Sequence, residues 1–124
     1  MSSKASILVV DDELSIREFL EIMLKRDNYE VVSCESASAA LDQLKKQNFD
    51  LVITDISMPG MNGIDLLHKI KQQRHETAVI IITAHGSMES AVEALKLGAS
   101  DYLTKPFQID EMKISIQSCL RTIE

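Results

Sequence analysis

Carboxylates follow two of the most apolar runs in this 124-residue chain. Asp11 and Asp12 come after the run SILVV at 6–10, and Asp55 comes after the run LVIT at 51–54. If the carboxyl ends of these runs meet, the carboxylates repel one another and need a cation among them. A hard divalent cation fits, and Mg²⁺ typically takes one or two carboxylates with waters and a phosphate oxygen.

A hydroxyl and a lysine stand at the ends of two later apolar runs. Thr83 follows AVIII at 78–82, and Lys105 follows DYLT at 101–104. Lysine is a compact cation that suits phosphate. Together with the acids and a divalent cation, these groups match phosphoryl transfer, which depends on positioning and charge neutralisation. Asp55 also offers a nucleophile, because an aspartate carboxylate can form an aspartyl-phosphate.

The elements that must position these groups alternate between strand and helix. Runs of Val and Ile without polar alternation are typical of strands buried on both faces of a parallel sheet. We expect such strands at 6–10, 51–54 and 78–82, with weaker candidates at 29–34 and 101–104. Between and after them, five sets of apolar residues at helical spacing each mark one helix face: Ile16, Phe19, Leu20, Met23 and Leu24; Ala37, Ala40, Leu41 and Leu44; Ile64, Leu67 and Ile70; Met88, Ala91, Val92 and Leu95; and Ile109, Met112, Ile116, Cys119, Leu120 and Ile123.

A strand–helix unit repeated five times predicts an α/β fold with a parallel sheet and helices on both faces, because the crossovers are right-handed. In such a sheet, function gathers at the carboxyl ends of the strands. Gly98 stands where the glycine that ends a helix is expected, just past Lys96.

Composition and charge narrow the class of protein. The length and a hydrophobic fraction of 45% suit one globular domain, 1–124. A formal net charge of −6 argues against a nucleic-acid-binding surface. Cys34 and Cys119 lie far apart without metal-ligand spacing, as in a reduced cytosolic protein. No apolar stretch approaches the ~20 residues that span a bilayer, so we expect a cytoplasmic protein that binds neither membrane nor nucleic acid.

Four blocks of the sequence carry a family resemblance. VVDDE at 9–13, DLVITDISMPGMNG at 50–63, IIITAHG at 80–86 and DYLTKPF at 101–107 resemble the signature blocks of the receiver domain of two-component response regulators. The blocks stand in the family's order and spacing across essentially the whole chain. The stretch 82–107 further resembles receivers of NtrC-type enhancer-binding regulators. The resemblance implies a flavodoxin-like, doubly wound (βα)5 fold with strand order 2-1-3-4-5.

The resemblance also implies a phosphoacceptor and a magnesium site. Asp55 matches the phosphoacceptor. Asp12 matches a direct Mg²⁺ ligand, Asp11 matches a ligand that acts largely through water, and the backbone carbonyl of Ser57 matches the third protein ligand. The loop after Asp55 must then hold that carbonyl in place.

The residues of that loop fit this need. Pro59 stiffens the backbone, while Gly60 and the pair Asn62-Gly63 permit the turns into the next helix.

Further residues match the family's switch. Thr83 matches the hydroxyl that binds the phosphoryl group, and Lys105 matches the lysine that contacts a phosphoryl oxygen. Tyr102 matches the switch aromatic, which turns inward when Thr83 moves. The bond between Lys105 and Pro106 matches one that the family holds in cis.

The function that the resemblance implies is signal reception rather than turnover of an external substrate. A sensor histidine kinase supplies the phosphoryl group from a phosphohistidine, the receiver itself catalyses the transfer to Asp55, and water later removes the group. The conformational change then controls transcription through the protein's own C-terminal effector domain, or acts on a target protein, or forms a phosphorylation-dependent homodimer.

Other functions stay open at this point. A stand-alone receiver can act as a phosphotransfer intermediate. An Asp-nucleophile phosphatase needs D-x-D, whereas Ser57 stands at the second position. A flavin module needs a phosphate loop rich in Ser, Thr and Gly where this chain has DDELS at 11–15. A non-phosphorylated pseudo-receiver is disfavoured, because no matched position is lost.

Several other positions have plainer interpretations. Glu13 is read as a helix-start acid, which favours the helix dipole. His68 and His75 are read as surface residues, whereas His85 stands beside the expected site and is a candidate for tuning the lifetime of the phosphoryl group. Ile114 stands opposite the apolar face of the last helix, as an exposed residue or a partner contact.

Overall fold

The computed structural model describes residues 5–73, 76–84, 86 and 88–121. In these residues strands and helices alternate in the predicted order: β1 (Ser6–Val10), α1 (Leu14–Arg26), β2 (Glu30–Cys34), α2 (Ala37–Lys46), β3 (Leu51–Asp55), α3 (Gly63–Gln73), β4 (Ala78–Thr83), α4 (Met88–Lys96), β5 (Asp101–Thr104) and α5 (Ile109–Arg121). Every predicted strand is present, with its ends within one residue of the prediction. Ile123 lies outside the described residues.

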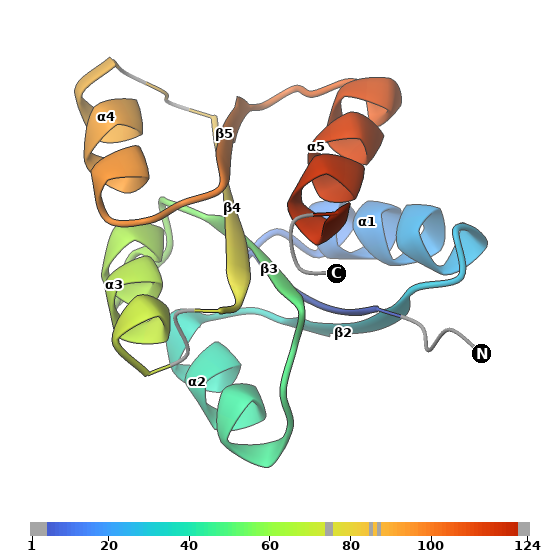
Figure 1. Cartoon of the computed structure of the whole chain (residues 1–124), viewed down its shortest axis with the longest axis horizontal. Helices are drawn as coiled ribbons and strands as arrows, with labels where there is room; N and C mark the ends of the chain where they lie inside the picture. The colour runs from blue at the N-terminus through green and yellow to red at the C-terminus, as the bar shows by residue number, and fades with distance from the viewer. Residues whose placement is uncertain (1–4, 74–75, 85, 87, 122–124) are drawn as a thin grey trace.

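The strands form one parallel sheet in the order β2-β1-β3-β4-β5. Figure 1 shows α1 and α5 on one face of this sheet and α2, α3 and α4 on the other. The fold prediction and the strand order 2-1-3-4-5 are therefore confirmed.

Alternation along the buried strands divides the core in two. In β1, Leu8 and Val10 face the layer of α2, α3 and α4, whereas Ile7 and Val9 face the layer of α1 and α5. All residues of β3 and β4 are buried. This two-sided burial explains why the central strands carry apolar residues without polar alternation.

The predicted apolar face of α4 does not pack on the core. Met88, Val92 and Leu95 are 80%, 40% and 52% exposed, and the buried residue of this helix is Ala94. The covered side, centred near Ser90 and Ala94, lies about 130° around the helix from the apolar stripe at 100° per residue. The spacing predicted the helix correctly but predicted the wrong buried side, because the small side chain of Ala94 is what docks on the sheet.

Gly98 ends α4 as predicted. Its φ is +105°, a left-handed value that favours glycine. Its amide donates to the carbonyl of Leu95 at 3.1 Å, and the Ala99 amide donates to that of Ala94 at 3.0 Å. These two bonds form a Schellman motif.

The glycines of the loop after β3 have distinct roles. Gly60 has a φ of +80° and makes the turn. Gly63 instead permits a close approach, because a Cβ there would overlap the backbone carbonyl oxygen of Asp55. The Asn62 side chain caps α3, since its Oδ1 accepts from the Asp65 amide at 2.9 Å. The predicted turn at Asn62-Gly63 is thus a helix cap followed by a packing contact.

We expect Gly63→Ala to destabilise the chain by about 2 to 3 kcal/mol, because the new methyl group collides with rigid backbone at Asp55. Gly60→Ala is the matched control. It has nothing within 4 Å of its Cβ position and should cost only about 1 kcal/mol for the left-handed backbone. Urea unfolding followed by circular dichroism measures both. A Gly63→Ala chain as stable as Gly60→Ala would contradict the packing role.

Candidate functional site

The sheet brings the predicted acids together at the carboxyl ends of β1 and β3. Asp11 directly follows β1 and is fully buried, and Asp55 is the last residue of β3 and is 4% exposed. Asp12, by contrast, is exposed. One carboxylate oxygen from each of these residues lies within 4.8 Å of the others.

Lys105 is the cation at the centre of this cluster. Its Nζ lies 2.9 Å from Asp11 Oδ2, 2.9 Å from Glu13 Oε1 and 3.3 Å from Asp55 Oδ2. The backbone amide of Lys105 donates to the carbonyl of Thr83 at 2.7 Å, which ties the lysine to the end of β4. The carboxyl ends of β1, β3, β4 and β5 thus meet here.

The environment of Asp55 favours its neutral form. Burial raises the pKa of this carboxyl, and the Asp11 charge raises it further. Lys105 and the Ser57 amide, which donates to Asp55 Oδ1 at 3.3 Å, oppose that shift without cancelling it. The charged form of Asp55 is therefore less favourable here than in water, even with the lysine in place.

Lys105 stays charged in this setting. Burial alone would lower the pKa of its ammonium group, but the carboxylates of Asp11, Glu13 and Asp55 together raise it above its ordinary value. Lys105 therefore keeps its positive charge and is suited to contact a phosphoryl oxygen.

The acidic cluster can bind a metal ion. Asp11 Oδ2 is buried and, apart from its ion pair with Lys105, accepts no hydrogen bond from the described residues. An all-oxygen donor set of three carboxylates, one of them solvent-exposed, suits a hard divalent cation that keeps several waters. The Ser57 amide lies beside Asp55, and the ligation by its carbonyl stays a prediction.

The switch candidates lie on β4 and β5, the last two strands of the sheet. Thr83 is 1% exposed at the end of β4 and pairs in register with Thr104 of β5. Tyr102 is half-buried, and its hydroxyl forms a hydrogen bond of 2.7 Å with Ser90 Oγ of α4.

The peptide bond between Lys105 and Pro106 is cis, as the resemblance implied. Pro59 is exposed in the loop that leads from Asp55 to α3.

Glu13 was missed as a member of the site. The sequence interpretation made it only a helix-start acid, yet its carboxylate contacts Lys105. The available signal was its type: glutamate is not a favoured residue at the N-cap position, where Ser, Thr, Asp and Asn lead.

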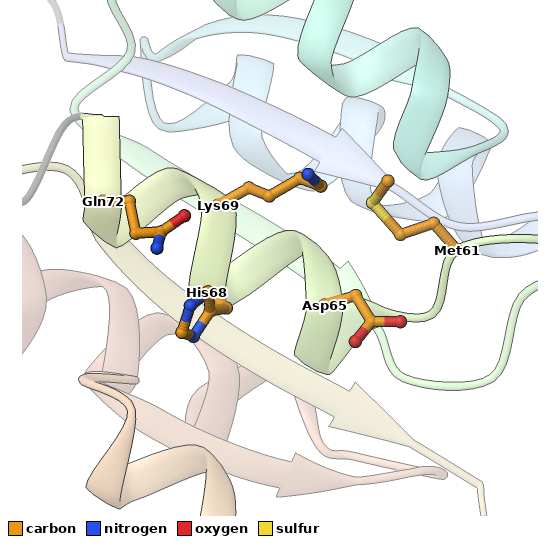
Figure 2. Close-up of a pocket in the computed structure, with 5 residues that line it drawn as sticks. All are labelled: Met61, Asp65, His68, Lys69 and Gln72. Atoms are coloured by element: carbon orange, nitrogen blue, oxygen red, sulfur yellow. The ribbon is translucent and has the colours of Figure 1, made fainter.

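A shallow groove elsewhere on the surface does not belong to the cluster. Figure 2 shows its lining, Met61, Asp65, His68, Lys69 and Gln72, on α3 and the loop before it. His68 is exposed, as predicted. His75 and His85 lie outside the described residues.

Two further predictions concern the surface. Ile114 is 66% exposed on α5, as the helical spacing predicted. Within the described ranges, no helix has both the length and the apolar character needed to cross a membrane.

Comparison with known proteins identifies relatives along the whole chain. A transcriptional regulatory protein from Bradyrhizobium diazoefficiens, FixJ, is 40% identical over 124 residues, which cover all of this chain and 60% of FixJ. The transcriptional regulatory protein ZraR of Escherichia coli K12 is 43% identical over 114 residues, which cover 92% of this chain and 26% of ZraR. The chain therefore spans only part of these relatives.

Solved structures agree with the sequence relatives. The beryllofluoride-activated receiver domain dimer of NtrC4 superposes with a TM-score of 0.92 at 32% identity, and the match covers 96% of this chain and 98% of that one. The family model of the response regulator receiver domain matches residues 7–117. The chain belongs to the response regulator receiver domain family, and its likeness to NtrC-type receivers is confirmed.

Proposed function

We propose that Asp55 is the phosphoacceptor of this receiver and that a phosphohistidine of a sensor histidine kinase is the donor. The observation that carries the proposal is the position of Lys105, which lies within 3.3 Å of buried carboxylates from two different strand ends. A lysine held there faces the place where a phosphoryl group on Asp55 would sit. Family membership supports the same role.

The transfer itself needs only one bond made and one broken. A carboxylate oxygen of Asp55 attacks the phosphorus atom, the bond between phosphorus and the histidine nitrogen breaks, and its electron pair returns to the imidazole. Hydrolysis reverses the state of Asp55: a water oxygen attacks phosphorus, and the bond between phosphorus and the Asp55 oxygen breaks. The protons of the water pass to phosphate and solvent, inorganic phosphate leaves, and the carboxylate is restored. The receiver catalyses both steps by positioning and by charge neutralisation.

We propose Mg²⁺ as the metal, held by Asp11, Asp12, Asp55 and the backbone carbonyl of Ser57. When bound, the ion neutralises charge that develops on the phosphoryl oxygens. Lys105 supplies the second positive charge, from the side of β5. The raised pKa of Asp55 fits this assignment, because the carboxylate is stabilised once a cation joins it.

Signal output begins at the end of β4 in this proposal. The Thr83 hydroxyl turns toward the phosphoryl group, and Tyr102 follows it inward. The Tyr102 hydroxyl is hydrogen-bonded to Ser90, so a movement of Tyr102 breaks or shifts a contact of α4. Phosphorylation shifts the balance between two states by the difference in their affinity for the phosphoryl group.

The output we propose is control of transcription in the cytoplasm, with residues 1–124 as one receiver domain. FixJ and ZraR are named transcriptional regulatory proteins, and each is longer than the stretch it shares with this chain. The proposed targets are the protein's own C-terminal effector domain, a partner protein or a phosphorylation-dependent homodimer. The NtrC4 receiver is described as a dimer in its beryllofluoride-activated form, which supports the last of these.

Incubation with acetyl phosphate and Mg²⁺ tests the phosphoacceptor. We expect intact mass spectrometry to show one phosphoryl adduct that Asp55→Asn abolishes, because the amide is not a nucleophile. Asp65→Asn, on the exposed first turn of α3, is the matched control and should keep the adduct. An adduct that survives in Asp55→Asn, or its absence from the unaltered chain, would refute the assignment. Steady turnover of phosphate monoesters would instead indicate a phosphatase.

The metal assignment predicts a pH-dependent stabilisation by Mg²⁺. At a hundredfold excess over Kd, the ion should add about 2.7 kcal/mol to the free energy of unfolding. The ligand carboxylates must be deprotonated, and the pKa of Asp55 is raised, so the gain is full at pH 8 and is lost as the pH falls through that raised value. Thermal melting with and without MgCl2, repeated at a series of pH values from 8 downward, measures it.

Asp12→Asn should remove most of this gain at pH 8, whereas Asp65→Asn should leave it intact. Asp12 is the suitable target because it is the exposed member of the cluster, so its change leaves the buried charges in place. An effect of Mg²⁺ that stays constant across the pH series, or an undiminished effect on Asp12→Asn, would count against the site.

A further inference from the structure

Glu13 makes a contact that the proposed chemistry does not use. Its Oε1 lies 2.9 Å from Nζ of Lys105, closer than Asp55 Oδ2 at 3.3 Å. The Glu13 side chain is 55% exposed, whereas that of Lys105 is 9% exposed. The Lys105 ammonium group thus contacts two buried carboxylates, those of Asp11 and Asp55, and one solvent-exposed carboxylate, that of Glu13.

The local structure shows that Glu13 does not cap the helix that it begins. Glu13 is the N-cap residue of α1, yet its side chain accepts no hydrogen bond from the amides of the first turn, all of which are described. Its own amide donates to Asp11 Oδ1 at 2.9 Å, which fixes the backbone beside the acidic cluster. Glu13 thus stands at the N-cap position but contacts a lysine instead of the helix amides. Such departures from local preference concentrate at functional sites.

We infer that Glu13 is a positioning residue that competes with the phosphoryl group for Lys105. In the unphosphorylated chain, the Glu13 carboxylate balances part of the lysine charge. When a phosphoryl group forms on Asp55, Lys105 has to turn toward it, and its contact with Glu13 is the exposed one that can be given up to solvent. Glu13 therefore lowers the affinity of the site for the phosphoryl group and shortens the lifetime of the phosphorylated state. This inference rests on the proposed function of Asp55.

The geometry favours competition over simple support of the helix. A carboxylate at a helix N-terminus is stabilising wherever it stands in the first turn. The Glu13 carboxylate instead reaches a residue that lies 92 positions away in the sequence. Because the Glu13 carboxylate is 55% exposed, solvent weakens this ion pair relative to the buried ones, so its principal effect is on where the ammonium group points.

Affinity for beryllofluoride, an anion used as a stand-in for the phosphoryl group, tests the inference at equilibrium. Glu13→Gln keeps the shape of the side chain and removes its charge. We expect it to bind beryllofluoride about two- to fivefold more tightly than the unaltered chain in saturating Mg²⁺. Glu18→Gln, an exposed position on α1, makes the same change in net charge and should leave the affinity unchanged.

A double-mutant cycle separates an effect through Lys105 from direct repulsion by Glu13. In a Lys105→Met background, Glu13→Gln should no longer change the affinity. If the gain persists there, Glu13 acts on the anion directly and the positioning role is wrong. If Glu13→Gln binds no more tightly than Glu18→Gln, the inference falls while the proposed function stands. An unaltered chain that takes neither beryllofluoride nor a phosphoryl group would overturn the proposed function itself.

A second measurement needs no change at Lys105. Acetylation of its amine by an N-hydroxysuccinimide ester, mapped by peptide mass spectrometry, reports how firmly the ammonium group is held. Glu13→Gln should acetylate Lys105 about two- to fivefold faster than Glu18→Gln does. Equal rates would mean that Glu13 does not hold the lysine in solution, and the inference would fail.

Discussion

The structure depends on the balance of charge between Lys105 and the carboxylates around it. Asp11 and Asp55 have side chains at most 6% exposed, and each buried ion costs several kcal/mol to remove from water. One ammonium group offsets part of this cost. The carboxylates of Asp11, Asp12 and Asp55 still outnumber it, and this deficit of positive charge is what a divalent cation would fill. The folded chain therefore keeps a site that is short of positive charge.

The rest of the fold holds this arrangement in place. Only parallel strands bring the ends of β1, β3 and β5 to the same edge, and complete burial of β3 leaves Asp55 little freedom to move. The loop behind it is closed by the amide of Gly63, which donates to the Ile56 carbonyl at 2.9 Å. Close backbone packing beside Asp55 thus limits how the carboxylate can relieve its repulsion.

How much could be predicted from the sequence differs between the fold and the site. Two-sided burial leaves uninterrupted apolar runs, so the strands and the convergence of Asp11, Asp55 and Lys105 were predictable. The buried side of α4 was not, because periodicity marks an apolar stripe but does not show what covers it. For Glu13 the sequence offered only an unusual residue type at a helix start; the identity of its partner was not predictable, because Lys105 lies 92 positions away and no local pattern records that contact.

The exposed stripe of α4 bears on how a signal could leave the site. This helix buries Ala94 and contacts the sheet through the bond between Ser90 and Tyr102, while Met88 and Leu95 face solvent. An element with little apolar burial is held less firmly than its neighbours. If Thr83 and Tyr102 move as proposed, they act on a helix that gives up little buried apolar surface when it moves. The exposure of the apolar face of α4 therefore fits a role of this helix in signal output, because a firmly packed α4 would resist the change.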